Sequence, residues 1–186
     1  MTSALHIARA ARVVQRGGVL AYPTEAVFGL GCLPQDRDAV ERVLAIKRRS
    51  WRKGLLLIGA DLGQLERYAT LPPEPRLSEV LASWPGPVTW VLAARPAAPR
   101  WVTGGRDSVA VRLTDHALAR ELCAKIGQAI VSTSANLSGR APFRRLLPLR
   151  RGLGAEVDYV LAGSLGGLAA PTTIRDGRTG AVLRRS

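Results

Sequence analysis

Apolar residues recur along this chain with two kinds of spacing, one typical of helices and one typical of strands. The segment from Ser3 to Arg16 has helical spacing, with Thr2 or Ser3 able to cap its start and the pair Gly17–Gly18 ending it. The same spacing predicts further helices at residues 38–49, 61–69, 77–84 and 115–126.

Short apolar runs separate these helices. Leu55–Ile58 is continuous and bounded by glycines, which is typical of a buried strand, and Ser108–Leu113 alternates as a strand should. Further strands are predicted at residues 19–22, 88–93, 129–131, 157–161, 172–174 and 181–183. Because strands and helices interleave, we predict an α/β fold with a mixed sheet. No linker divides the chain, so we expect a single domain over residues 1–186.

The composition excludes several classes of protein. Hydrophobic residues make up 47% of the chain, which is enough for a core. No apolar run reaches the roughly 18 residues of a membrane helix, and the N-terminus lacks a signal pattern. We therefore expect a cytoplasmic protein without membrane contact. Cys32 and Cys123, the only cysteines, form no CxxC pair, which argues against a structural zinc site and favours two free thiols.

The charge is strongly basic, with 27 Lys and Arg against 14 Asp and Glu, a formal net charge of +13. Arginine suits phosphate, so the excess indicates a polyanionic partner, although an arginine-rich genome explains it equally well. Residues 140–151 hold several arginines and no acid. This run is either a solvated, mobile loop or a contact with a nucleic-acid backbone.

Two polar segments follow the first predicted strand and the second predicted helix. Residues 22–31, YPTEAVFGLG, lie where α/β sheets bind ligands, although an ordinary Pro/Gly connection explains them as well. Residues 47–53, KRRSWRK, include five basic residues. Lys47 and Arg49 favour anion binding, while the other two arginines of this segment are expected in solvent at a helix C-terminus.

Two more polar segments lie in the second half of the chain. Residues 132–139, STSANLSG, offer hydroxyls and an amide for phosphate or ribose, whereas a helix cap needs only one such residue. Residues 171–178, PTTIRDGR, contain an Asp-Gly turn that predicts a hairpin. No phosphate loop, dinucleotide fingerprint or nucleophile elbow occurs. Cations and hydroxyls with few bases fit catalysis by positioning and charge neutralisation.

Six segments of the chain, in the order in which they occur, resemble the YrdC family and most closely its short TsaC type. The combination of KxR (Lys47, Arg49) with SxN (Ser134, Asn136) makes the resemblance specific. The matching segments are YPTEAVFGLG at 22–31, AIKRRSWRKGLLLI at 45–58, WPGPVTWVL at 84–92, SVAVRL at 108–113, STSANLSG at 132–139 and TTIRDGRTG at 172–180.

The resemblance implies a twisted mixed sheet with flanking helices around a basic concave cleft. It also implies a reaction in which L-threonine, bicarbonate and ATP give threonylcarbamoyl-AMP and pyrophosphate. A transferase complex of the TsaD, TsaB and TsaE type would then modify tRNA beside the anticodon, with tRNA as a further partner of this chain. Mg²⁺ would be carried by ATP, without metal ligands from the protein.

The resemblance also implies two sets of site residues. Lys47 and Arg49 would act as the catalytic pair. ATP would be bound by Lys47, Arg49, Ser134, Asn136 and Arg184. Threonine would be bound by Thr24, Arg112, Ser132 and Thr172, with the Arg112 guanidinium as a fork for its carboxylate.

Three positions depart from the pattern of relatives. Ala26 and Phe28 replace a second Thr and a Tyr of the first motif, and Ile58 stands where longer relatives carry His. One alternative function is a non-catalytic double-stranded RNA-binding, tRNA-binding or ribosome-maturation factor, motivated by the charge and by residues 140–151. Another is a regulatory sensor that binds ATP and threonine without turnover. Only 5% of the residues are aromatic, which weakens recognition of bases by stacking but not binding of phosphates.

Overall fold

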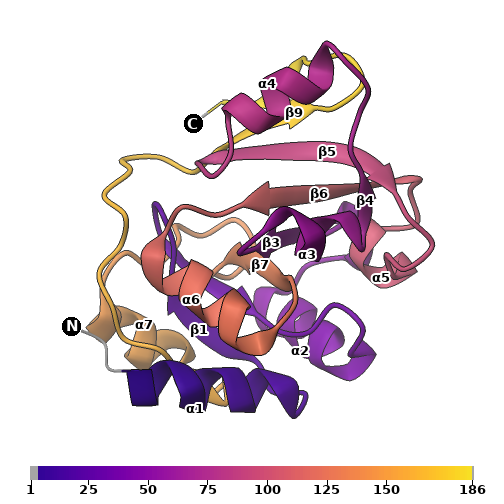
Figure 1. Ribbon diagram of the computed structural model, residues 1–186. Helices are drawn as coiled ribbons and strands as arrows, with labels where there is room; N and C mark the ends of the chain where they lie inside the picture. The colour runs from indigo at the N-terminus through magenta and orange to yellow at the C-terminus, as the bar shows by residue number, and fades with distance from the viewer. Residues whose placement is uncertain (1–3, 186) are drawn as a thin grey trace.

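Helices pack on both faces of a twisted sheet in the computed structural model, which describes residues 4–185 (Figure 1). The helices are α1 (Ala4–Gln15), α2 (Arg37–Lys47), α3 (Leu62–Glu66), α4 (Arg76–Ala82), α5 (Arg100–Thr103), α6 (Ala117–Ile126) and α7 (Leu146–Leu153), with a 3-10 turn η1 (Trp51–Lys53). The strands are β1 (Leu20–Pro23), β2 (Phe28–Gly31), β3 (Leu56–Gly59), β4 (Ala69–Thr70), β5 (Val88–Ala94), β6 (Ser108–Leu113), β7 (Ile130–Ser134), β8 (Tyr159–Val160), β9 (Thr173–Asp176) and β10 (Val182–Arg184).

Within residues 4–185 the strands form one ten-stranded sheet in the order β10-β9-β5-β6-β3-β7-β2-β1-β8, with β4 paired to β5. The pairs β3–β6, β5–β9 and β1–β8 are parallel and the other pairs are antiparallel. The predicted α/β class with a mixed sheet is therefore confirmed. The predicted hairpin of the last two strands is also present, as β9 and β10.

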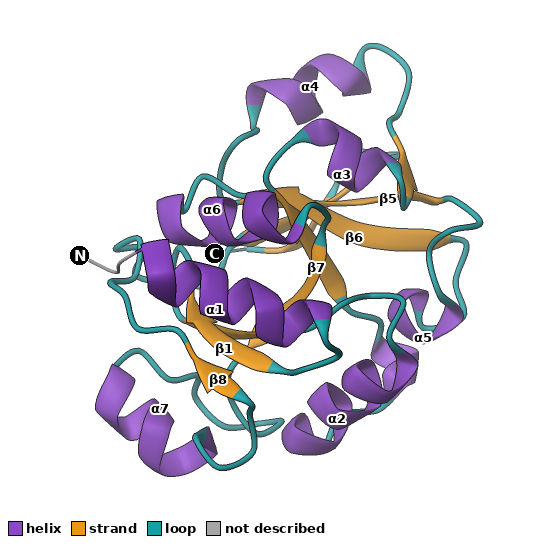
Figure 2. Ribbon diagram, turned by 60° about the horizontal axis from the view of Figure 1, so that its bottom comes forward, coloured by secondary structure: helices purple, strands orange, loops and turns teal. Residues whose placement is uncertain are grey.

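One face of the sheet is covered over only part of its area. Helices α1 and α6 lie side by side on it (Figure 2). They bury Leu20, Tyr22, Ile58 and Ile130 of the strands. Alternation along a strand places Ser132 two residues beyond Ile130 on the same face, where it lines an open cleft. The same sheet face is therefore apolar under the helices and polar beyond them.

The opposite face of the sheet carries the larger core. Residues of α2, α4, α5 and α7 pack there against the strand side chains that point to this face. These include Phe28, Leu57, Val111 and Val131. Helix α2 is fixed at its start, because the Asp36 carboxylate accepts from the backbone N–H of Ala39 at 2.9 Å. This packing places the end of α2, and the polar segment that follows it, beside the cleft.

Several sequence predictions of elements were wrong. Phe28–Gly31 is a strand rather than part of a loop, paired with β1 on one side and β7 on the other. The predicted helix at 61–69 ends at Glu66, and Ala69 and Thr70 form a short strand instead. The second half of the arginine run lies in helix α7 (Leu146–Leu153), because Leu149 and Leu153 give this helix a face to bury. The possible cap residues Thr2 and Ser3 lie outside the described residues.

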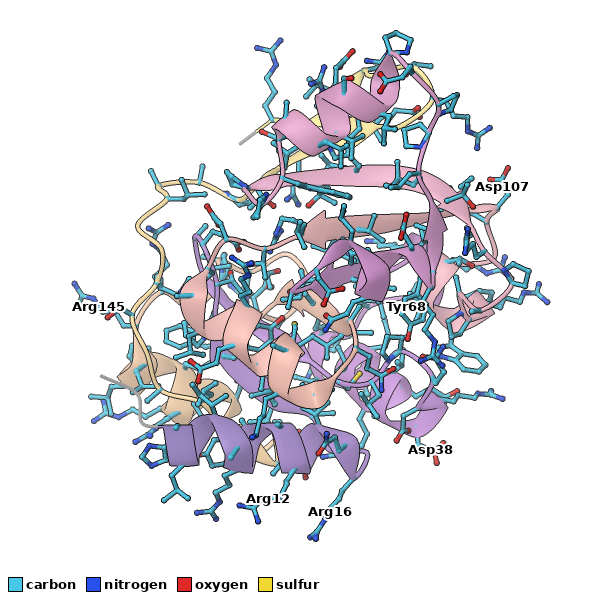
Figure 3. The ribbon with its side chains drawn as sticks, viewed as in Figure 1. Arg12, Arg16, Asp38, Tyr68, Asp107 and Arg145 are labelled. Atoms are coloured by element: carbon cyan, nitrogen blue, oxygen red, sulfur yellow. The ribbon has the colours of Figure 1, made fainter. Side chains whose placement is uncertain are left out.

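Basic side chains also occur far from the cleft. Arg12 and Arg16, near the end of α1, are exposed and point away from the molecule (Figure 3). They add to the net charge without facing the polar segments.

Candidate active site

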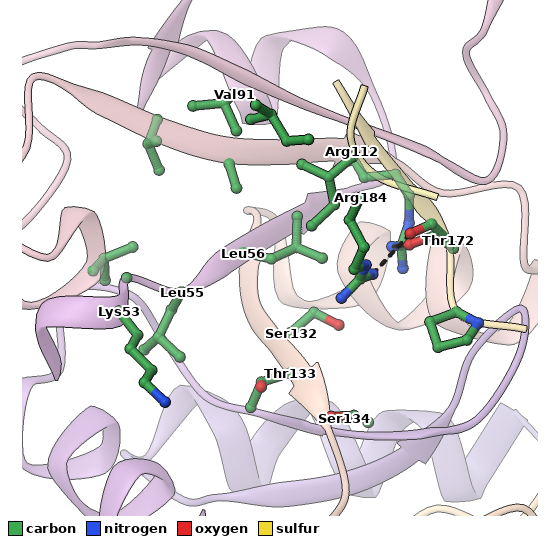
Figure 4. Close-up of a pocket in the computed structure, with 18 of the residues that line it drawn as sticks. Lys53, Leu55, Leu56, Val91, Arg112, Ser132, Thr133, Ser134, Thr172 and Arg184 are labelled. Atoms are coloured by element: carbon green, nitrogen blue, oxygen red, sulfur yellow. Dashed lines mark hydrogen bonds between the residues drawn. The ribbon is translucent and has the colours of Figure 1, made fainter. Parts of the chain in front are cut away.

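A cleft with a volume of about 600 Å³ opens on the sheet face beyond α1 and α6 (Figure 4). Its walls come from β2, β3, β6, β7 and the C-terminal hairpin. The predicted site residues that line it are Thr24, Arg49, Arg112, Ser132, Ser134, Thr172 and Arg184. The other two predicted residues, Lys47 and Asn136, lie behind this wall and contact Ser134.

A buried ion pair forms the inner part of the cleft. The Arg112 guanidinium donates to a carboxylate oxygen of Glu25 at 2.9 Å, and each residue is only 3% exposed. Thr114 donates to the other carboxylate oxygen at 2.7 Å, and Arg112 donates to the Thr172 hydroxyl at 2.9 Å. We call Glu25, Arg112, Thr114 and Thr172 the inner cluster.

The Arg112 guanidinium is thus partly occupied by a carboxylate of the protein itself. Its Nε–H is buried and has no acceptor within residues 4–185. Burial of a donor without an acceptor is costly, so this N–H is suited to a ligand oxygen. Sequence reasoning did not include Glu25 in the site, although it stands in the first polar segment and is one of few acids there.

Two strands hold Ser132 in a defined orientation. The buried Tyr22 hydroxyl donates to the Ser132 hydroxyl at 2.8 Å. Burial is the main cause that raises the pKa of Tyr22, so the phenol stays protonated and remains a donor. Since Ser132 accepts this hydrogen bond, its own O–H is available to donate to a ligand in the cleft.

Lys47 organises the SxN loop from behind. Its ammonium donates to the backbone carbonyl of Ser134, to the backbone carbonyl of Asn136 at 3.2 Å and to the side-chain oxygen of Asn136 at 2.9 Å. The Ser134 hydroxyl also donates to that side-chain oxygen, at 2.6 Å. Burial, with the nearby Arg49 cation, lowers the pKa of Lys47 to about 8.

A left-handed residue separates the two members of the KxR motif. Helix α2 ends at Lys47, and Arg48 has φ 48°, which reverses the chain. Lys47 stays buried beneath the loop, whereas Arg49 reaches the cleft wall and donates to the carbonyl of Gly54 at 3.1 Å. The Nε–H of Arg49 is buried and, in the described part of the chain, without an acceptor.

Three cations surround Gly54 at the other end of the cleft. Arg49, Lys53 and Arg106 line the cleft there, and Lys53 and Arg106 are exposed. Arg106 donates to the carbonyl of Thr103 at 3.3 Å. We call these three residues the outer rim. Figure 4 shows Lys53 well apart from Arg112 and Thr172, and sequence reasoning had not singled out Lys53 or Arg106 for the site.

Arg184 lies between the inner cluster and the outer rim. Its guanidinium donates to the carbonyl of Thr172 at 2.7 Å (Figure 4). Burial lowers the pKa of Arg184, and the cations Arg112 and Arg49 lower it further. The mutual repulsion of these cations is relieved when an anion binds, so the cleft is suited to anionic ligands.

A segment without helix or strand, residues 162–171, crosses the first polar motif. The N–H of Gly166 donates to the carbonyl of Thr24, and the N–H of Leu168 donates to the carbonyl of Glu25, both at 3.0 Å. We call this segment the strap. It leads directly into Thr172 of the inner cluster.

Part of the prediction for residues 140–151 was wrong. Arg144 does not belong to a freely solvated loop, because it donates two hydrogen bonds to carbonyls of the strap. Arg144 is nevertheless exposed, as are Arg140, Arg145, Arg150 and Arg151. Within residues 4–185 there is no cluster of three or more His, Cys, Asp or Glu residues that could hold a metal ion. No helix found there is long and apolar enough to span a membrane.

Comparison with known proteins assigns the family. A family model named for Sua5, YciO and YrdC, and described as telomere recombination, matches residues 12–186. The chain belongs to the Sua5/YciO/YrdC family. The resemblance to YrdC proteins seen in the sequence motifs is therefore confirmed.

Relatives within the Sua5/YciO/YrdC family match almost the whole chain. A protein of Halorhodospira halophila named threonylcarbamoyl-AMP synthase is 53% identical over 99% of this chain and 96% of its own length. One of Nitrosococcus oceani with the same name is 51% identical over 94% of this chain and 95% of its own length.

Solved structures of the family share the fold. Sua5 of P. abyssi in complex with L-threonine superposes with a TM-score of 0.86 and 32% identity over 91% of this chain. This chain spans about half of that protein, 50% of its length. YciO of E. coli superposes with a TM-score of 0.84 and 27% identity, over 96% of this chain and 87% of YciO. The predicted YrdC-like architecture is thereby confirmed.

Proposed function

We propose that this chain is a threonylcarbamoyl-AMP synthase, which makes threonylcarbamoyl-AMP and pyrophosphate from L-threonine, bicarbonate and ATP. The names of its relatives support this activity. The structural observation that supports this activity is a single cleft with different cations at its two ends. One end is the buried inner cluster, and the other is the exposed outer rim. Such a cleft fits an amino acid at one end and a polyphosphate at the other.

The inner cluster is the proposed threonine site. Arg112 and Thr172 would hold the substrate carboxylate, with the free Nε–H of Arg112 as one donor. Thr24 and Ser132 line the same part of the cleft. The Ser132 O–H, left free by Tyr22, would donate at the boundary between threonine and the nucleotide.

ATP would lie along the outer rim. Arg49 and Arg184 are placed to contact its phosphates, with Ser134 beside them. Lys47 and Asn136 remain part of the proposed ATP site, although their hydrogen bonds show that they support Ser134 from behind. We therefore assign Lys47 to the organisation of this loop and Arg49 to direct phosphate contact.

The chemistry requires positioning more than proton transfer. The neutral threonine amine attacks the carbon of bicarbonate, and as the N–C bond forms a C–O bond of bicarbonate breaks, so that a carbamate is made and water leaves. A carbamate oxygen then attacks the α-phosphorus of ATP. The new P–O bond replaces the bond to the β-phosphate, and pyrophosphate leaves. Arg49 and Arg184 would stabilise the charge that gathers on the phosphates in the transition state. Holding both substrates in one cleft supplies the orientation.

The protein itself offers no carboxylate set for Mg²⁺ in its described part. We propose that Mg²⁺ enters bound to the phosphates of ATP. The product would pass to a transferase complex of the TsaD, TsaB and TsaE type that modifies tRNA. These partners, direct contact with tRNA and a cytoplasmic location are part of the same proposal.

Pyrophosphate release tests this function. Purified protein is incubated with ATP, L-threonine, bicarbonate and Mg²⁺, and each is omitted in turn. We expect release that requires threonine, bicarbonate and ATP and that serine or alanine does not support. No release, together with tight and salt-sensitive tRNA binding, would instead favour the non-catalytic RNA-binding factor, an alternative that the names of the relatives do not favour.

A further inference from the structure

The strap leads to the proposed threonine site. Residues 162–171 join β8 to β9 without a helix or strand of their own. At the far end of the strap, Pro171 and Thr172 line the cleft, and the Thr172 hydroxyl accepts from Arg112. The strap on one side, and β9 with Arg184 on the other, therefore set where Thr172 meets Arg112.

One side chain and two backbone hydrogen bonds hold residues 164–168 of the strap. His116 Nε2 lies 3.0 Å from the carbonyl of Ser164. The N–H groups of Gly166 and Leu168 then donate to the first polar motif, as described above. Gly167 has φ +86°, a conformation that lets the chain turn there, and a Cβ added at this position would meet no atom within 4 Å.

Arg144 holds the second half. Its Nη1 donates to the carbonyl of Ala169 at 2.7 Å and its Nη2 donates to the carbonyl of Leu168 at 2.9 Å. Among the side chains of residues 4–185, only that of Arg144 forms hydrogen bonds with residues 168–171. Hydrogen bonds from a charged guanidinium are stronger than those between neutral groups.

Arg144 is itself fixed to the strands of the site. The preceding residue, Phe143, donates its N–H to the carbonyl of Ala135 at 3.1 Å and accepts from the N–H of Phe28 at 2.9 Å. Ala135 follows β7 directly, and Phe28 begins β2. Arg144 therefore links β2 and β7, of which β7 carries Ser132 and Ser134, to the strap that leads into Thr172.

We propose that Arg144 is a positioning residue for the threonine site and that its charge serves the strap rather than a nucleic acid. This inference rests on the proposed function. Ordering a ten-residue segment costs conformational entropy. Without Arg144 the strap would populate other positions, and Thr172 would meet Arg112 for a smaller fraction of the time. Threonine affinity falls by that fraction.

The test compares Arg144→Ala, Arg144→Lys and the matched control Arg145→Ala. Arg145 is exposed and points away from the molecule (Figure 3), and its substitution removes the same charge one residue away. In Arg144→Ala we expect the KM for threonine to rise about fivefold while kcat changes less than about twofold. Arg144→Lys should be intermediate, because an ammonium also donates to carbonyls but lacks the fork. Arg145→Ala should behave as the unaltered protein.

Amide hydrogen exchange supplies a readout that does not depend on catalysis. Exchange across residues 162–172 should become faster in Arg144→Ala and stay unchanged in Arg145→Ala. Equal exchange and equal KM in both variants would overturn the inference. So would an equal loss of tRNA affinity in both variants with the threonine KM unchanged. If the unaltered protein releases no pyrophosphate, the proposed function fails, and the exchange experiment still decides the role of Arg144 at the strap.

Discussion

The inner cluster and the outer rim of the cleft are built in opposite ways. In the inner cluster Glu25, Arg112 and Thr114 are buried and already bonded to one another. In the outer rim Lys53 and Arg106 are exposed, and Arg49 and Arg106 donate only to backbone carbonyls in the described structure. The inner cluster is organised before a ligand arrives. The cations of the outer rim have no carboxylate partner in the described structure.

This difference follows from what each end is proposed to bind. Threonine has few polar atoms, so its site must supply each partner in a fixed place, and prior organisation reduces the entropy lost on binding. A triphosphate carries several charges and attracts mobile cations over a longer range. Substitutions at each end, and the pH dependence of the KM for ATP, test whether the two ends differ in this way.

The largest effect is expected at the inner cluster. Arg112→Ala should lower threonine-dependent pyrophosphate release by about 10³-fold or more. The free energy of unfolding should fall by about 3–5 kcal/mol, because Glu25 is left buried without its partner. Urea unfolding and the pyrophosphate assay measure the two effects.

Two further variants control this experiment. Arg106→Ala, which removes an exposed arginine of the outer rim, should leave the free energy of unfolding within about 0.5 kcal/mol. The double variant Glu25→Gln/Arg112→Met should recover most of the lost stability without recovering activity. An Arg112→Ala protein as stable as the unaltered one would show that the inner cluster is not a tightly coupled buried pair.

A smaller effect, on activity alone, is expected at Arg49. Arg49→Ala should lower kcat/KM for ATP by about 10²-fold, since one charge that stabilises the transition state is lost. The KM for threonine and the urea midpoint should change little. Arg52→Ala is the control, because Arg52 lies over the Trp51 ring at 5.4 Å and does not line the cleft. A threonine KM that rises as much as the ATP KM would mean that the two ends do not act separately.

The smallest effect concerns pH. The pKa of Lys47 is lowered to about 8, so its ammonium is charged below that pH and loses its proton above it. The neutral amine has two N–H donors instead of three, so it can serve fewer of the four oxygens of the SxN loop that lie within reach of Lys47. The KM for ATP should therefore rise by about tenfold from pH 7 to pH 9.

The comparison for this profile is Lys47→Met, which cannot titrate. Its KM for ATP should be higher than that of the unaltered protein at every pH. Between pH 7 and pH 9 this KM should not show the roughly tenfold rise. The threonine KM of the unaltered protein serves as the internal control and should not follow the same curve. Identical profiles in the two proteins would assign the pH dependence to another group.

Strong local patterns predicted most of the fold. Ser108–Leu113 was predicted with the bounds that β6 has, because its alternation is uninterrupted. Strand β2 was missed because two of its four residues are glycines. A Cβ at Gly29 would lie 3.2 Å from the Thr24 side chain, and one at Gly31 would lie 2.9 Å from Tyr22. Tertiary crowding, which local propensity does not record, selects glycine there.

The site could be predicted only as separate segments. Polar residues at unexpected places marked the walls of the cleft, but not which of them touch. Glu25 and Arg112 are 87 positions apart, and only the folded sheet shows that they pair. Arg144 was misjudged for the same reason, since the carbonyls that it binds lie 24 and 25 positions away. The roles proposed for individual residues toward threonine and ATP stay predictions until the variants are measured.

The position of β10 has a practical consequence for handling this protein. Arg184 reaches into the cleft from β10, so a polypeptide fused after residue 186 would be tethered close to the cleft. A short tether gives a fused segment an effective concentration in the millimolar range, enough for an acidic tag to compete with a phosphate ligand. A tag at the other end would precede α1, which packs on α6, away from the hairpin (Figure 1). Kinetic work on this enzyme is therefore best done with the fusion at the N-terminal end.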